Sequence, residues 1–173
     1  MPNMTLTVLE KAIFKHASRG ILVDTNLLLL FLIGIFGENH IKEFKKIQKY
    51  SIEDFNIVNN IIRRFSRINV TPQILAEISN LSKQMYKSNL KQYFLYLIDR
   101  IRRSKEIYIN KNDLLLVPEL LPKYGFTDLS ILESAKVTKC LVFTDDFQLV
   151  GFLRKKKVVV INLNEIRTEL WFT

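Results

Sequence analysis

Four acidic positions in this 173-residue chain lie where their carboxylates could meet. Asp24 directly follows a short apolar segment, and the pair Asp145 and Asp146 follows another. Glu77 and Asp128 lie near the starts of two expected helices. In open parallel sheets, ligands bind beyond the carboxyl ends of the strands, where such residues converge. Because hard cations such as Mg²⁺ and Mn²⁺ prefer oxygen ligands, these residue types would support metal-assisted chemistry.

Each acid taken alone also has a purely structural explanation. Asp24 could cap the helix that follows it, and Asp128 could be a cap or an acidic residue in a first helical turn. One of Asp145 and Asp146 could cap the next helix. Glu77 lies beside the apolar stripe of its helix, where solvated glutamates are common. The functional indication therefore comes from the four placements together.

Five short segments, rich in β-branched and other apolar residues, are candidate strands. Two or three of them are almost entirely apolar, which is typical of parallel strands buried on both faces. The five segments are residues 21–23, 67–70, 106–109, 140–143 and 158–161.

Helical patterns lie between these segments. Ser51 and Asp54 form a capping-box pattern, and Thr71-Pro72 places an N-cap before a proline at the first helical position. A longer helix is expected around residues 90–101. The alternation of helices and strands predicts an α/β fold, a three-layer α/β/α sandwich around a mainly parallel five-stranded sheet.

Length and composition fit one domain with its own hydrophobic core. Hydrophobic residues make up 48% and charged residues 25%, which argues against disorder and against a membrane protein. We expect one domain over residues 1–173, with an extra helix in 1–19 and the core in 20–163. The single cysteine, Cys140, rules out an internal disulfide and a cysteine-based metal site.

The acids belong to four short motifs that follow one another in a definite order. The motifs are Val-Asp-Thr-Asn at 23–26, Thr-Pro-x-x-x-x-Glu at 71–77, Thr-Asp-x-Ser at 127–130 and Thr-x-Asp at 144–146. Their order and spacing resemble those of the PIN-domain ribonucleases, a family that includes the toxins of VapBC-type toxin–antitoxin modules. The resemblance covers roughly residues 20–163, although the N-terminal helix and the long stretch between the first two motifs depart from a minimal member.

The resemblance implies a set of site residues and a cofactor. Four carboxylates would hold Mg²⁺ or Mn²⁺, and three further side chains would orient them or the attacking water. Asp145 is adjacent to the last acid and could be the ligand in its place, and one or two metals could act. The implied carboxylates are Asp24, Glu77, Asp128 and Asp146, and the supporting residues are Asn26, Ser130 and Thr144.

This ligand set suits phosphodiester hydrolysis. A bound divalent metal lowers the pKa of its water and neutralises charge that develops on the transition state. Without metal the clustered carboxylates would repel one another, and the pKa of one or more would rise. Because no histidine or cysteine accompanies the acids, zinc is disfavoured.

The net charge points to a polyanionic partner. There are 26 Lys and Arg residues against 17 Asp and Glu, which gives +9 with neutral histidines. This balance favours RNA or DNA, with an anionic membrane surface as the second class. The candidate phosphate-binding elements are Lys42, Lys45, Lys46 and Lys49; Arg63, Arg64 and Arg67; Arg100, Arg102 and Arg103; and residues 154–157.

The expected function is a Mg²⁺- or Mn²⁺-dependent endoribonuclease, with RNA as substrate and a toxin module as one setting. A non-catalytic RNA-binding or regulatory PIN-like module is the alternative, and a phosphoacceptor like those of response regulators ranks lower. The apolar run at residues 27–36 is too short to span a bilayer, so we expect a cytoplasmic protein without membrane insertion. That run favours a buried helix, although an antitoxin or a second copy of the chain could also contact it.

Overall fold

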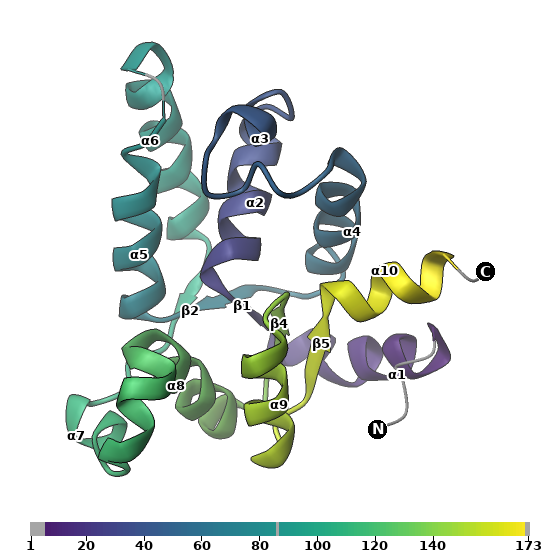
Figure 1. The fold of residues 1–173 in the computed structure, drawn as a ribbon, viewed down its shortest axis with the longest axis vertical. Helices are drawn as coiled ribbons and strands as arrows, with labels where there is room; N and C mark the ends of the chain where they lie inside the picture. The colour runs from purple at the N-terminus through teal and green to yellow at the C-terminus, as the bar shows by residue number, and fades with distance from the viewer. Residues whose placement is uncertain (1–5, 86, 172–173) are drawn as a thin grey trace.

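Five strands form one sheet in a computed structural model of the chain, which describes residues 6–85 and 87–171. All neighbouring strands pair in parallel, in the order β3-β2-β1-β4-β5 (Figure 1). The expected α/β class is confirmed, and the sheet is entirely parallel. The strands are β1 (Ile21–Val23), β2 (Ile68–Val70), β3 (Lys105–Glu106), β4 (Leu141–Thr144) and β5 (Val160–Asn162).

The strand order reverses between β1 and β4, at the centre of the sheet. The chain builds outward from β1 through β2 to β3, and then returns to place β4 on the other side of β1. Both central strands are completely buried, and Val23 pairs with Phe143 at their carboxyl ends. The amide of Asp24 donates to the carbonyl of Phe143 at 3.0 Å, which holds these ends together. Such a reversal opens a crevice for ligands.

Helices cover the sheet in two layers, which confirms the predicted three-layer sandwich. In Figure 1, α2, α4, α5 and α6 lie above the strands, whereas α8 and α9 lie below them. The helices are α1 (Leu6–His16), α2 (Thr25–Phe36), α3 (His40–Glu43), α4 (Ile52–Ile62), α5 (Pro72–Ser82), α6 (Lys87–Arg102), α7 (Lys111–Leu114), α8 (Leu121–Thr138), α9 (Phe147–Lys155) and α10 (Leu163–Trp171).

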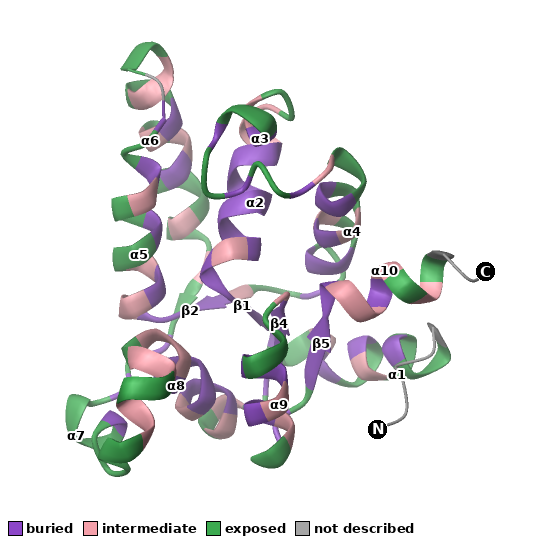
Figure 2. Cartoon of the chain, in the orientation of Figure 1, coloured by how far each residue is buried: buried purple, intermediate pink, exposed green. Residues whose placement is uncertain are grey.

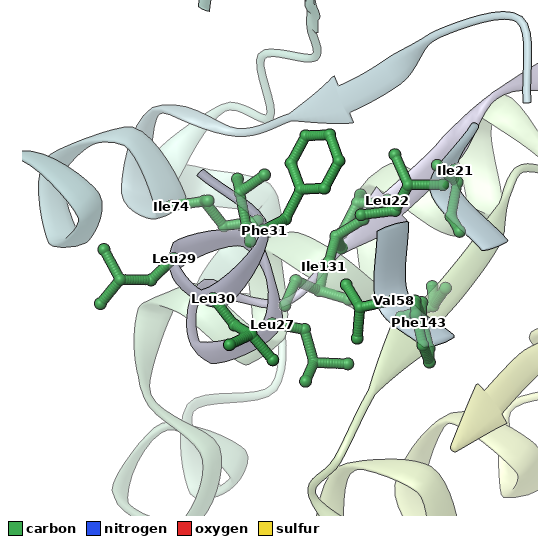
Figure 3. Packing of buried hydrophobic residues seen from close by; sticks show 14 of the residues in the cluster. Ile21, Leu22, Leu27, Leu29, Leu30, Phe31, Val58, Ile74, Ile131 and Phe143 are labelled. Carbon is green, nitrogen blue, oxygen red and sulfur yellow. The ribbon is translucent and has the colours of Figure 1, made fainter. Parts of the chain in front are cut away.

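Helix α2 contains the longest apolar run and lies inside the molecule. Nine of its 12 residues are buried, and the helix is almost entirely purple in Figure 2. Figure 3 shows its side chains Leu27, Leu30 and Phe31 among core residues from other elements, such as Ile74 and Val58. The run is therefore covered within the chain, as the favoured interpretation predicted. In the part of the chain that the structure describes, no helix has both the length and the apolar character needed to cross a membrane.

The crossing of α2 over α4 depends on a glycine. A Cβ atom at Gly34 would lie 2.3 Å from Cδ2 of the Phe55 ring, far inside van der Waals contact. We therefore expect Gly34→Ala to lower the free energy of unfolding by about 1–3 kcal/mol, because the helices must separate. Gly151→Ala in α9 is the matched control. It meets no atom within 4 Å, so it should instead stabilise by about 0.5–1 kcal/mol. Urea unfolding measures the free energy of unfolding of both variants. Equal values for Gly34→Ala and Gly151→Ala would contradict the close packing of α2 on α4.

The sequence located all five strands and matched both ends of β1, whereas the other four strands differ from the expected segments by one to three residues at one or both ends. The Ser51–Asp54 capping box and the Thr71 cap with proline after it are both present. The third strand is shorter than expected, with only residues 105–106 paired. Beyond Glu106, only the amide of Ile107 still donates to β2, at 2.8 Å to Val70, because β3 lies at the sheet edge. Helix α10 follows the expected core, and α1 falls within the expected N-terminal helix, whose residues 1–5 lie outside the described residues.

Candidate functional site

A cleft of about 480 Å³ opens where the strand order reverses. Four of the predicted acids line it, and each comes from a different part of the chain. Asp24 follows β1, Glu77 lies on α5, Asp128 lies on α8, and Asp146 follows β4. The remaining lining residues are Thr25, Asn26, Lys46, Asn80, Leu81, Tyr124, Gly125, Phe126, Thr127, Ile131 and Leu149. The topology thus brings together residues that are as far as 122 positions apart in sequence.

Asp24 is both a helix cap and a wall of the cleft. Its Oδ1 accepts from the amide of Leu27 at 2.9 Å, and its Oδ2 accepts from the hydroxyl of Thr144. The residue is only 6% exposed. Burial, followed by the nearby charge of Asp145, raises the pKa of Asp24 from 3.8 to about 7. The capping explanation and the site interpretation therefore apply to the same residue.

Glu77 joins three helices through two threonine hydroxyls. Thr25 Oγ1 donates to Oε2 of Glu77 at 2.6 Å, and Thr127 Oγ1 donates to Oε1 at 2.7 Å. Each oxygen of the Glu77 carboxylate therefore accepts one hydrogen bond, one from α2 and the other from α8. Neither threonine was among the site residues predicted from the sequence. Their positions directly beside Asp24 and Asp128 were the signal that could have identified them.

Asp128 lies just after a break in α8. Gly125 has φ +69° and ψ 175°, a conformation that favours glycine, and it separates two helical parts. Asp128 therefore lies in the first turn of the second part, as expected. No hydrogen-bond donor contacts its carboxylate among the described side chains and amides. Burial, and then the charges of Asp146, Asp24 and Glu77, raises the pKa of Asp128 to about 7.

The two adjacent acids after β4 have different environments. Asp146 lines the cleft and caps α9, accepting from the amides of Gln148 at 2.7 Å and Leu149 at 3.1 Å. Asp145 instead accepts from Tyr50 and Lys49, each at 2.7 Å, through its Oδ2 atom. Of the two positions left open by the sequence, the cleft is lined by Asp146.

The predicted supporting residues occupy three different positions. Asn26 lines the cleft itself, whereas Thr144 lies fully buried behind Asp24 and donates to it. Ser130 is also fully buried. Its hydroxyl lies 2.9 Å from that of Thr71 and donates to the carbonyl of Thr127 at 2.7 Å. Ser130 therefore joins the start of α5 to α8 and supports the cleft from behind.

The donor set fits Mg²⁺ or Mn²⁺ in chemistry, although it is not a closed cage. Within residues 6–85 and 87–171, no three His, Cys, Asp or Glu side chains gather closely enough to hold a metal ion. Local donors already bind the carboxylates of Asp24, Glu77 and Asp146, as described above. Mg²⁺ keeps several waters and needs only one or two carboxylates together with substrate phosphates. The raised pKa values of Asp24 and Asp128 mark uncompensated negative charge, which a cation would stabilise.

Several of the predicted basic elements form ion pairs within the chain. Arg64 pairs with Glu10, Arg103 with Asp99, Arg154 with Glu165 and Lys49 with Asp145. The Arg64 and Arg103 pairs are exposed on both sides, so they contribute little to stability and could exchange for phosphate, whereas Asp145 and the Arg154–Glu165 pair are less exposed. Lys46 differs from them because it lines the cleft.

No model of a known protein family matches the chain, and neither a curated protein nor a solved structure matches it. The resemblance to PIN-domain ribonucleases therefore remains a prediction from the four motifs.

Proposed function

We propose that this protein is a Mg²⁺- or Mn²⁺-dependent nuclease that hydrolyses phosphodiester bonds in RNA. The observation that carries the proposal is the convergence of Asp24, Glu77, Asp128 and Asp146 on one cleft at the strand-order reversal. The order of the motifs, which resembles that of the PIN-domain ribonucleases, agrees with it. So does the net charge of +9, which would attract a polyanion towards an acidic cleft.

The proposed roles follow from how each acid is held. Asp24 and Asp128 are the most desolvated carboxylates of the set, so they would bind the metal most directly. Glu77 is fixed by Thr25 and Thr127, and it would keep α5 and α8 at their present separation. Asp146 is more exposed and would face water or substrate. A bound Mg²⁺ or Mn²⁺ would supply an activated water and neutralise charge on the phosphate.

Purified protein and labelled RNA test this proposal. We expect cleavage with Mn²⁺, and no cleavage either with EDTA or after Asp24→Asn. Asparagine is as good a helix cap as aspartate, so this variant should keep α2 intact. Cleavage that survives both EDTA and the substitution would refute the proposal, because neither a bound metal nor Asp24 would then be needed for it.

The second candidate is a non-catalytic RNA-binding module, and one specific observation favours it. No three acids in the described part of the chain form a ready-made metal group. Such a module would bind RNA equally well in Mn²⁺ and in EDTA, and Asp24→Asn would not change its affinity. A nuclease would instead cleave RNA at a rate that depends on Mn²⁺ and on the Asp24 carboxylate. The candidate partners beyond RNA, an antitoxin and a second copy of the chain, stay predictions.

A further inference from the structure

We infer that the cleft holds one nucleotide of its substrate between Lys46, which contacts a phosphate, and Phe126, on which the base stacks. The inference rests on the proposed function, because it names how the same cleft would recognise its polymer. It adds a cation and an aromatic ring to a site so far described by its acids.

Lys46 is the cationic side chain of the cleft. The other described lining residues are acidic, neutral polar or apolar. Lys46 forms no ion pair with any acid in the described ranges, although several carboxylates share its cleft. A phosphate oxygen is the strongest partner that an exposed ammonium group finds in a nucleic acid. An unpaired lysine beside a cluster of acids therefore fits a role in drawing the phosphate backbone to them.

The loop that carries Lys46 is held firmly against the end of β4. Tyr50 at the end of this loop is 1% exposed, and its hydroxyl donates to Asp145 at 2.7 Å. Lys49 bonds the same carboxylate oxygen at 2.7 Å, and Lys42 Nζ donates to the carbonyl of Tyr50 at 3.0 Å. Asp145, which directly precedes Asp146, thus connects the lysine-bearing loop to the end of β4. This contact places a cation beside the acidic wall of the cleft without using a cleft-lining acid.

Phe126 offers an aromatic surface on α8. It follows Gly125 at the helix break, is 48% exposed and lines the cleft. No aromatic ring of the described residues packs against it, whereas its neighbour Tyr124 stacks on Phe152 at 3.9 Å between centroids. An exposed ring in a mostly polar cleft fits a nucleobase, because base stacking on aromatic side chains tolerates any base.

The two residues approach the cleft from different layers of the fold. Lys46 belongs to the loop between α3 and α4, above the sheet in Figure 1, and Phe126 belongs to α8, below it. The cleft volume of about 480 Å³ lies within the range of small-ligand sites, which is the scale of one nucleotide. The acids come from both layers and from the sheet between them, because Glu77 lies on α5, Asp128 lies on α8, and Asp24 and Asp146 follow β1 and β4.

The test measures binding of a short, labelled single-stranded RNA by fluorescence anisotropy in Ca²⁺, which takes the same oxygen ligands as the proposed cofactor. Phe126→Ala should weaken binding about 10- to 100-fold. Lys46→Ala should weaken it and lower the slope of log affinity against log salt by about 0.7. Lys11→Ala and Phe147→Ala are the matched controls, because both side chains are exposed, do not line the cleft and belong to no predicted phosphate-binding element. Thermal unfolding checks that all four variants fold.

Each outcome decides the inference. Losses confined to Lys46→Ala and Phe126→Ala support it. Equal losses in Lys46→Ala and Lys11→Ala, an unchanged affinity in Phe126→Ala, or no RNA binding by the wild type would overturn it. The cleavage assay with Mn²⁺ tests the proposed nuclease activity independently of this binding assay. RNA binding with the expected variant effects but without cleavage would support the nucleotide site and contradict the proposed nuclease activity.

Discussion

Asp128→Asn is expected to make the metal-free protein more stable at about pH 8 and to reduce RNA cleavage roughly 100- to 1,000-fold. The stability gain arises because the Asp128 carboxylate is desolvated and faces three other acids, which raises its pKa to about 7. The unfolded chain ionises this group near its ordinary value of 3.8. Between these two values the folded state holds a proton that the unfolded state has lost. Stability from this group therefore falls as pH rises from about 4 through about 7.

Thermal unfolding in EDTA at about pH 5 and about pH 8 measures this effect. The wild type should lose more stability across this range than Asp128→Asn, because the variant has no ionisable group at position 128 and, of the two carboxylates with a raised pKa, only Asp24 still titrates near pH 7 in it. At the higher pH the variant should unfold several degrees later, since each kcal/mol shifts Tm by about 2–4 °C in a chain of this length. Asp113→Asn in α7 is the matched control and should show neither change, because Asp113 is exposed and lies outside the cleft. A wild type and an Asp128→Asn variant with equal Tm at both pH values would contradict the desolvated carboxylate.

Mn²⁺ is expected to raise the Tm of the wild type by about 5–10 °C at about pH 8. A ligand at 100 times its Kd stabilises the folded state by about 2.7 kcal/mol, and this gives the expected shift in a chain of this length. The gain should be larger than for surface binding, because a cation also offsets the desolvation and the charge repulsion that raise the pKa of Asp24 and of Asp128. At about pH 5 the shift should shrink, because protons then occupy the carboxylates.

Variants separate this stabilisation from non-specific binding. Asp24→Asn and Asp128→Asn should each lose most of the Mn²⁺-induced shift, whereas Asp113→Asn should keep it. A shift of equal size in all three variants would place the ion outside the cleft. The absence of any shift in the wild type would favour the non-catalytic RNA-binding module.

The fold could be read from the sequence because its signals are local. Apolar runs that end in polar residues predicted the buried strands, and Thr71-Pro72 and the Ser51–Asp54 pair predicted helix starts that the structure contains. The third strand was overestimated, because its residues alternate like a strand but lie at an edge where only β2 can pair with them.

The partners of the acids could not be read from the sequence. Asp145 and Asp146 both follow β4, and only the three-dimensional structure shows that Tyr50 and Lys49 bind Asp145 while Asp146 lines the cleft. The placement of Lys46 likewise depends on a loop whose path is set by that distant contact. Sequence reasoning grouped Lys46 with other lysines of the same stretch, since nothing local distinguishes it.

The rate of RNA cleavage as a function of Mn²⁺ concentration tests the central claim most directly. The account predicts no cleavage in EDTA, a saturable rise with Mn²⁺, and little or no rise with Asp24→Asn at any concentration. A rate that is independent of Mn²⁺, or a wild type and an Asp24→Asn variant with the same rate curve, would contradict a metal-dependent nuclease in this cleft.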